Sequence, residues 1–218
     1  MSWNQALNLL FPQKCPFCRL LLEHSQDLLC RECQSKLPWL TGKGAERRVD
    51  FSKGCVSPLT YRGAVPDAVR RYKFGGFKSY KRSFGALMAQ CAQDQFNETA
   101  DILTWAPLSR KRLRERGYDQ AELLAREIGA VLGLPVLPTL EKVRHTKPQS
   151  DLTEESARRA NALGAYAALP GVDVAGKGII LVDDVVTSGA TLSECARVLL
   201  ESGAKWVWCL TLAQAKSD

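Results

Sequence analysis

GIILVDDVVTSGAT, residues 178–191, is the stretch that decides the fold of this 218-residue chain. Its four apolar residues at 179–182 include three with β-branched side chains, which predicts a strand buried on both faces of a parallel sheet. Asp183 and Asp184 follow at the carboxyl end of that strand, where ligands bind in open α/β sheets. The apolar spacing beyond Gly189 then predicts a helix over 190–202. The stretch therefore predicts an α/β fold with a ligand site before a helix.

Small and hydroxyl-bearing residues join the predicted strand to the predicted helix: Thr187, Ser188, Gly189, Ala190 and Thr191. Glycine permits backbone torsions that other residues avoid, so successive amides can point inward. A helix amino terminus beside such amides favours an anion. The alternative is an ordinary turn in which one aspartate caps the helix, but a cap needs neither a second acid nor this run. The sequence predicts a phosphate site.

This stretch resembles the phosphoribosyl pyrophosphate (PRPP) motif of type I phosphoribosyltransferases. The resemblance implies that Asp183 and Asp184 are the catalytic pair and hold the ribose hydroxyls, near a Mg²⁺ carried in with PRPP. It also implies that residues 187–191 bind the 5′-phosphate.

Four of the eight cysteines lie in two short pairs, Cys15 with Cys18 and Cys30 with Cys33. This spacing lets one tight turn present two sulfurs to a tetrahedral ion, as in a zinc ribbon. A disulfide framework would need an oxidising compartment, and unligated core thiols would not need the paired spacing. Four thiolates close the coordination shell, so we expect structural Zn²⁺. His24, between the pairs, is expected to be a solvated loop residue.

The length suits one sizeable α/β domain with a small appendage, and the composition, 45% hydrophobic and 24% charged, is ordinary for a globular protein. We expect a zinc module at 1–45 and the larger domain at 54–218, with the polar residues 41–53 as a linker. The sequence shows no basic leader and no apolar run long enough for a membrane span. These features predict a cytoplasmic protein.

Basic residues are concentrated in three segments, 62–82, 110–116 and 142–159, which hold 17 of the 30 lysines and arginines and only five acids. Such clustering indicates a polyanion or a pyrophosphate as ligand. We expect 110–116 to be a strand-end loop and 141–161 to be an irregular insert that acts as a lid. Arg112 and Arg116 are predicted to contact PRPP. The residues predicted to contact DNA or pyrophosphate are Arg110, Lys111, Arg114, Arg144 and Lys147.

Taken together, the cysteine module, SRKRLRERGYDQA at 109–121, RHTKPQ at 144–149, ARRAN at 157–161 and the PRPP motif resemble the ComF/GntX family. The resemblance implies a type I phosphoribosyltransferase fold and a role in natural competence or the use of extracellular DNA. It implies PRPP, single-stranded DNA and proteins of the competence machinery as partners. The usual RGFNQ of the family is RGYDQ here, with Asp119 in place of asparagine.

Two classes of function stay open on the sequence. An enzyme would join PRPP to a base in nucleotide salvage, with basic residues stabilising the departing pyrophosphate. A binding protein would keep the PRPP fold and use its basic segments on single-stranded DNA. The sequence does not identify an acceptor base. Trp206 and Trp208 are expected in the core or on the sheet face, with base stacking as the alternative.

Overall fold

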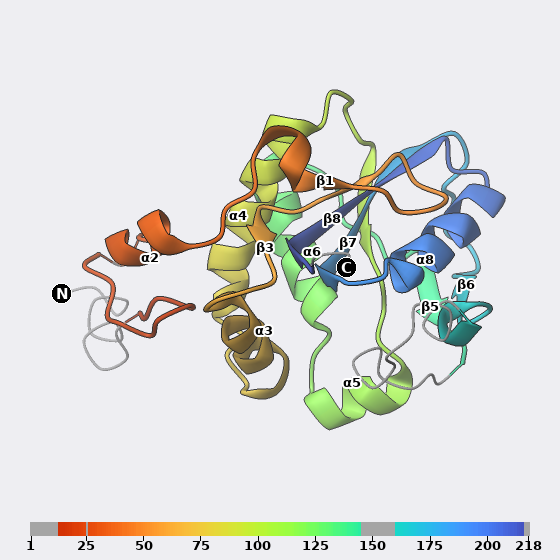
Figure 1. The fold of residues 1–218 in the computed structure, drawn as a ribbon. Coiled ribbons are helices and arrows are strands. Elements are labelled where there is room, and N and C mark those ends of the chain that lie inside the picture. The colour runs from red at the N-terminus through yellow and green to blue at the C-terminus, as the bar shows by residue number, and fades with distance from the viewer. Residues whose placement is uncertain (1–12, 25, 145–159, 216–218) are drawn as a thin grey trace.

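The computed structural model describes residues 13–24, 26–144 and 160–215, and its centre is a mainly parallel sheet covered by helices on both faces (Figure 1). The strands of the main sheet are β1 (Glu46–Arg47), β2 (Cys55–Val56), β3 (Leu59–Thr60), β4 (Ile102–Trp105), β7 (Gly178–Val186) and β8 (Trp206–Gln214). The helices are α2 (Arg31–Lys36), the 3-10 helix η1 (Gly42–Ala45), α3 (Val65–Phe74), α4 (Tyr80–Gln95), α5 (Arg110–Arg116), α6 (Gln120–Leu132) and α8 (Ala190–Glu201). This arrangement confirms the predicted α/β fold with a parallel sheet.

The sheet has the strand order β1-β2-β8-β7-β4, with β3 pairing with β8 beyond β2. All of these pairs are parallel except β1 with β2, which forms the antiparallel edge. In the central register, Ile180 of β7 lies opposite Trp208 of β8 and Leu103 of β4. A separate antiparallel pair, β5 (Leu140–Lys142) and β6 (Tyr166–Ala168), lies beside α8.

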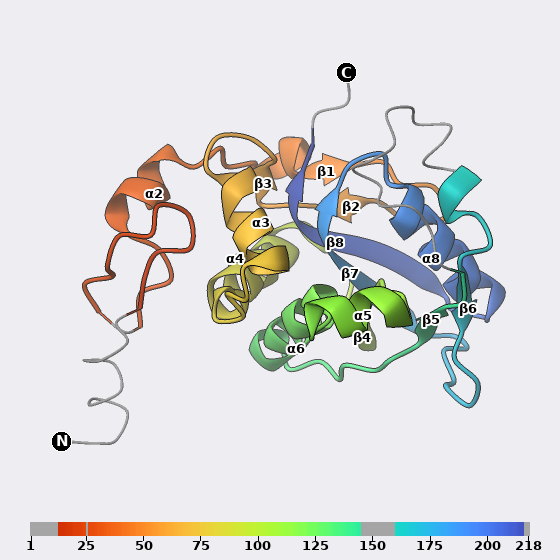
Figure 2. The same ribbon diagram turned by 90° about the horizontal axis from the view of Figure 1, so that it is seen from below.

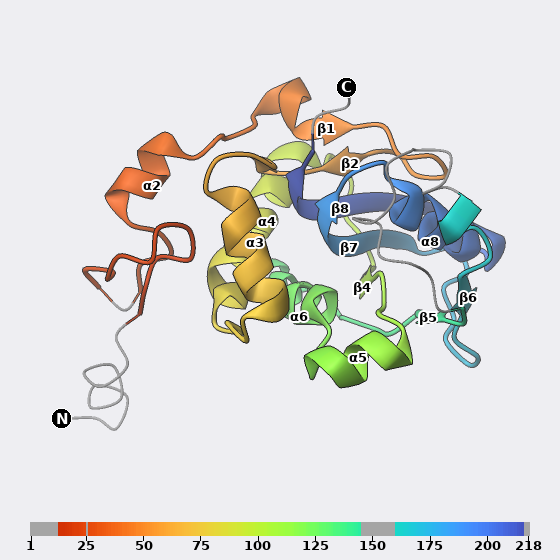
Figure 3. The same ribbon diagram turned by 60° about the horizontal axis from the view of Figure 1, so that its bottom comes forward.

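Strand β7 is buried on both faces, as its apolar run predicts. Ile180 and Val182 belong to the core beneath α3, α4 and α6, whereas Ile179 and Leu181 belong to the core beneath α8. Figure 3 shows the first group of helices and α8 on opposite sides of β7 and β8. Because β7 continues to Val186, both aspartates lie within the second half of the strand, toward its carboxyl end as predicted.

Two segments differ from the sequence predictions. Residues 110–116 form helix α5 and not a loop, because Ser109 caps the first turn and Gly117, with φ of 75°, ends the helix in the left-handed conformation. Residues 41–53 include η1 and β1, so part of the expected linker pairs with β2 as an edge of the sheet. The helix predicted over 190–202 is confirmed as α8, which ends one residue earlier.

The cysteine-bearing segment packs against the larger unit, at the flank formed by α3 and α4 (Figure 2). The rings of Phe17 and Phe84 lie 5.6 Å apart between centroids. Arg71 of α3 donates from Nη2 to the carbonyl oxygens of Pro16 and Phe17, both at 2.9 Å. Because one hydrophobic core includes residues from both parts, the stability of the small module is linked to that of α3 and α4.

Within the described ranges, no helix is both long enough and apolar enough to cross a membrane.

Candidate functional site

A pocket of about 800 Å³ lies at the carboxyl end of β7. Its wall includes the end of α3, one side of α5, the strands β5 and β6 and the first turn of α8. The predicted site residues that line it are Arg112, Arg116, Asp183, Asp184, Thr187, Ser188, Gly189, Ala190 and Thr191. Folding therefore brings the two acids, the small-residue loop and two of the predicted arginines to one cavity.

The loop before α8 has the backbone form that the sequence predicts. Gly189 has φ of 78°, a left-handed conformation, and is the N-cap of α8. A Cβ at this position would also come within 3.3 Å of Val49, so the loop is closely packed from behind. Because glycine carries no side chain, the N-cap offers no side-chain acceptor to the first-turn amides, and only Ala190 N–H donates to a nearby hydroxyl among the described residues, that of Ser188 at 3.4 Å. An anion bound here would complete the hydrogen bonding of the helix start.

Asp184 is held by a lysine that the sequence analysis did not assign. The Nζ of Lys73, at the end of α3, lies 2.8 Å from Oδ1 of Asp184, and the Asp184 side chain is only 5% exposed. The other oxygen of Asp184, Oδ2, is buried and has no hydrogen-bond partner among the described residues. A buried carboxylate oxygen without a donor is unfavourable, so it is suited to accept from a bound ligand.

Asp183 faces the pocket and is half-buried. Its Oδ1 accepts a hydrogen bond from the backbone N–H of Asp184 at 2.8 Å. Burial raises the pKa of Asp183 above its ordinary value, and the neighbouring charge of Asp184 raises it further. A cation or hydroxyl donors in the pocket would favour the ionised form of Asp183.

Helix α5 sorts the five predicted basic residues of 110–116 into two groups. Arg112 and Arg116, four residues apart and so on one face, are half-buried and line the pocket. The other three, Arg110, Lys111 and Arg114, are exposed and lie outside the pocket wall. The structure thus separates a pocket face from an outer basic face on this helix.

Of the last two predicted contacts, Arg144 is described by the structure and lies outside the pocket wall. Arg144 donates from Nη2 to the backbone oxygens of Leu163 at 2.6 Å and of Asn161 at 3.2 Å. This side chain therefore connects the two ends of the predicted lid. Lys147, and the rest of 145–159, lie outside the described residues.

Lys142 and Tyr166 are further pocket residues that the sequence analysis did not single out. Lys142 donates from Nζ to the Tyr166 hydroxyl at 3.0 Å. Burial lowers the pKa of Lys142 to about 8, and the nearby positive charge of Arg112 acts in the same direction. Arg112 belongs to α5 and Lys142 to β5, which are separated in the chain. Only the pairing of β5 with β6 and the packing of α5 bring the two cations together.

Asp119 connects the pocket wall to α6. Its Oδ1 accepts from the N–H groups of Ala121 and Glu122 at the start of α6, and its Oδ2 accepts from the N–H of Leu108 at 2.8 Å. Asparagine has one acceptor oxygen and could not satisfy both sides. The aspartate that replaces the asparagine of RGFNQ therefore joins the segment at Leu108 to the start of α6.

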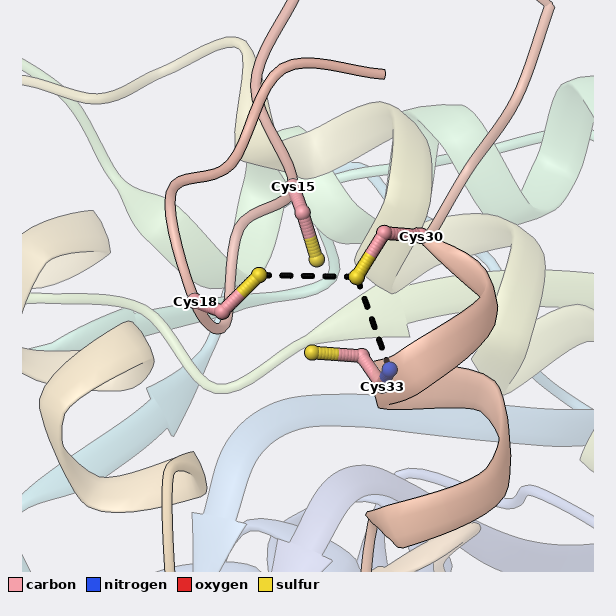
Figure 4. Close-up of side chains that lie close together, drawn as sticks. All are labelled: Cys15, Cys18, Cys30 and Cys33. Carbon is pink, nitrogen blue, oxygen red and sulfur yellow. Dashed lines mark hydrogen bonds between the residues drawn. The ribbon is translucent and has the colours of Figure 1, made fainter. Parts of the chain in front are cut away.

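The four paired cysteines form a second site, in the N-terminal module (Figure 4). Their sulfur atoms all lie within 4.8 Å of one another, and Figure 4 shows them pointing toward a common centre. They come from a tight turn at 15–18 and from the start of α2, as the pairing predicts. His24 is exposed and is not part of this group. A compact set of four thiols is the donor set of structural zinc.

Two family models match this chain, one in each part. The family described as "Phosphoribosyl transferase domain" matches residues 114–218, and the "Double zinc ribbon domain" matches residues 6–45. The fold, the pocket and the cysteine cluster define a phosphoribosyltransferase-like protein with a structural zinc ribbon.

Among curated proteins, the chain is 30% identical over 205 residues to the DNA utilization protein YhgH of Salmonella typhimurium, covering 90% of this chain and 82% of that one. It is 26% identical over 227 residues to Competence protein F of Haemophilus influenzae, covering 94% and 98%. The chain belongs to the ComF/GntX family. A solved glutamine PRPP amidotransferase from B. subtilis is similar at 22% identity and a TM-score of 0.44, over 64% of this chain and 30% of that one.

Proposed function

We propose that this chain binds PRPP with Mg²⁺ in the pocket at the end of β7 and acts in the uptake or use of DNA, contacting single strands through its basic faces. The observation that supports PRPP most directly is the joining of two acids, the amides of a helix start and converging cations in one cavity. The 5′-phosphate would be bound by residues 187–191 and the ribose hydroxyls by Asp183 and Asp184.

The residues fit a Mg²⁺–PRPP complex. Oδ2 of Asp184, which no described residue contacts by a hydrogen bond, and the half-buried carboxylate of Asp183 are hard oxygen acceptors, the type that Mg²⁺ and hydroxyl groups prefer. When bound, Mg²⁺ would neutralise charge on the pyrophosphate. Arg112, Arg116 and Lys142 supply positive charge from the protein at the pocket wall. Lys73, with its Nζ 2.8 Å from Oδ1 of Asp184, orients this side chain before the ligand arrives.

The DNA role is supported by the names of the relatives and by the outer basic residues. Relatives are named for competence and DNA utilization. Arg110, Lys111 and Arg114 are exposed outside the pocket, so they are available to phosphates of a strand even when PRPP occupies the cavity. Proteins of the competence machinery are the expected protein partners.

A phosphoribosyltransferase of nucleotide salvage is the second candidate, because the pocket is larger than a phosphate site needs and is lined by the complete acid pair. Here a base nitrogen would attack C1 of PRPP and pyrophosphate would leave, stabilised by the wall cations. Incubation with Mg²⁺, PRPP and a panel of free bases, with pyrophosphate release as the readout, tests this candidate. Release that depends on one base and disappears in Asp183→Asn would support it.

Thermal unfolding with Mg²⁺ and PRPP tests the binding proposal. A ligand that binds only the native state, at about a hundred times its dissociation constant, adds roughly 2.7 kcal/mol of stability. We expect Asp183→Asn combined with Asp184→Asn to remove this gain, and Asp173→Asn, an exposed site, to retain it. An unchanged midpoint for the wild type at saturating PRPP would reject the assignment.

Salt dependence tests the strand contact. Replacing Arg110, Lys111 and Arg114 together with glutamine should make the log–log salt slope for a single strand shallower by about 2, at roughly 0.7 for each phosphate that the variant no longer neutralises. The variant should still gain stability from PRPP, since these residues lie outside the pocket. An unchanged slope would remove the outer face of α5 from the DNA contact.

A further inference from the structure

Phe74, the last residue of α3, is an exposed aromatic at the pocket that neither PRPP nor the core explains. Its side chain is 71% exposed, the highest value among the large hydrophobic residues that the structure describes. It lines the pocket, although the neighbouring Tyr72 is fully buried. A ring this exposed contributes little to the stability of the fold. Its exposure at the pocket therefore indicates a site that contacts a ligand.

The guanidinium of Arg116 lies over the Phe74 ring, with Cζ 4.7 Å from the centroid. Gln120 accepts a hydrogen bond from Nη1 of the same arginine, which fixes the guanidinium in place. Phe74 comes from α3 and Arg116 from α5, so the two helices meet at this pair. Together they present two preformed planar groups at the pocket wall.

Positive charge surrounds this pair. Arg70 lies one turn earlier on α3 and Arg112 one turn earlier on α5, and both line the pocket. A flat aromatic surface within positive charge is suited to a ligand that carries both π-faces and phosphates. Proteins that bind single-stranded nucleic acids use this combination, because unpaired bases stack on aromatic rings while cations follow the backbone.

We propose that Phe74 and Arg116 form a stacking site for one unpaired base of a single-stranded nucleic acid. This inference deepens the single-strand contact proposed above and rests on it. A strand is favoured over a free base because the ring is mostly open to solvent, whereas sites for small ligands enclose most of the ligand. Bases in a duplex are excluded, since both of their faces are already stacked.

Fluorescence anisotropy of a fluorescein-labelled (dT)20 tests the site, with Phe74→Leu and Phe74→Trp as the variants. Leucine keeps the apolar character but lacks a π-face, so we expect its affinity to fall about 5- to 150-fold. Tryptophan should bind at least as tightly as the wild type. The salt slope should stay unchanged in both, because no phosphate contact is removed.

Two controls separate stacking from a general effect. An abasic strand of the same length should bind the wild type and Phe74→Leu equally, since it offers no base. Phe51→Leu makes the same change at an exposed phenylalanine outside the pocket, and should keep the affinity for (dT)20. Melting temperature and zinc content of each variant confirm that it is folded.

Equal binding of (dT)20 by the wild type and Phe74→Leu would overturn the stacking site without overturning the proposed single-strand contact. An equal loss on the abasic strand would also overturn it, because Phe74 would then act only by placing Arg116. If the wild type binds no single strand, the proposed DNA contact fails and this site fails with it. Pyrophosphate release with a free base that Phe74→Leu abolishes, at unchanged (dT)20 affinity, would reassign the ring to an acceptor base.

Discussion

Replacing Asp119 with asparagine should make the stability of this protein respond differently to pH. Asp119 is 6% exposed and accepts three backbone N–H groups, two at the start of α6 and one from Leu108. Burial nevertheless dominates and raises the pKa of this carboxyl to about 6, above the ordinary value of 3.8. The native state therefore holds a proton at pH values where the unfolded state has released it.

This difference in bound protons lowers the unfolding free energy of the wild type as the pH rises. A carboxyl with a raised pKa in the native state contributes stability below the unfolded pKa, and that contribution is lost as the pH rises through the native pKa. Between pH 5 and 7, the wild type should lose about 1.4 kcal/mol of unfolding free energy relative to Asp119→Asn, which cannot titrate. A constant offset of about 1 kcal/mol against the variant is superimposed, because the Leu108 N–H loses its acceptor.

Urea unfolding of both proteins at pH 5, 6 and 7 measures the effect. Loss of zinc at the acid end affects both proteins and cancels in the difference. Asp173→Asn removes one charge from an exposed turn, where Oδ1 accepts from Ala175 N–H, and so corrects for the general effect of net charge. Parallel stability curves for the wild type and Asp119→Asn would refute the reasoning and show that the three N–H donors outweigh burial.

Three other changes are predicted from the structure. In urea unfolding, Lys73→Met should lower the unfolding free energy by about 3 kcal/mol, because it leaves the side chain of Asp184 buried without its cation. A loss below about 1 kcal/mol would show that the pair is solvated. Removal of zinc by a chelator should speed backbone hydrogen exchange in α4 as well as in the zinc module, because Phe17 packs on that helix. Unchanged exchange in α4 would contradict this coupling. Gly178→Ala should cost about 1–3 kcal/mol of unfolding free energy in urea, since a Cβ there would clash with the Trp206 ring. The stabilisation by Mg²⁺ and PRPP should persist, because this residue is at the opposite end of β7 from the pocket.

Local patterns in the sequence were sufficient to predict the centre of the fold. The apolar run at 179–182 predicted a doubly covered strand, and Gly189 with its small neighbours predicted the turn into α8. The two cysteine pairs likewise predicted a compact sulfur cluster. Each of these features depends on residues close together in the chain, where side-chain periodicity and backbone torsions act directly.

Helix α5 is an element that the sequence prediction missed. Residues 110–116 were predicted to be a strand-end loop rich in basic side chains, although Ser109 and Gly117 stand at the positions of a helix cap and a helix stop. Those two signals were present in the sequence and would have predicted the helix. Its amphipathic sorting, with Arg112 and Arg116 inward, then follows from the spacing of four.

Tertiary structure alone decided which distant residues complete the two sites. Lys73 is more than a hundred residues from Asp184, and its ion pair exists only because α3 packs over the end of β7. The stacking of Arg116 on Phe74 and the docking of the zinc module through Arg71 depend on the same helix. The strand, the position of the two acids, the small-residue loop and the cysteine cluster could all be predicted from the sequence, because local spacing specifies them. The neighbours of those groups were decided by the burial of apolar helix faces against the sheet, which no local pattern encodes.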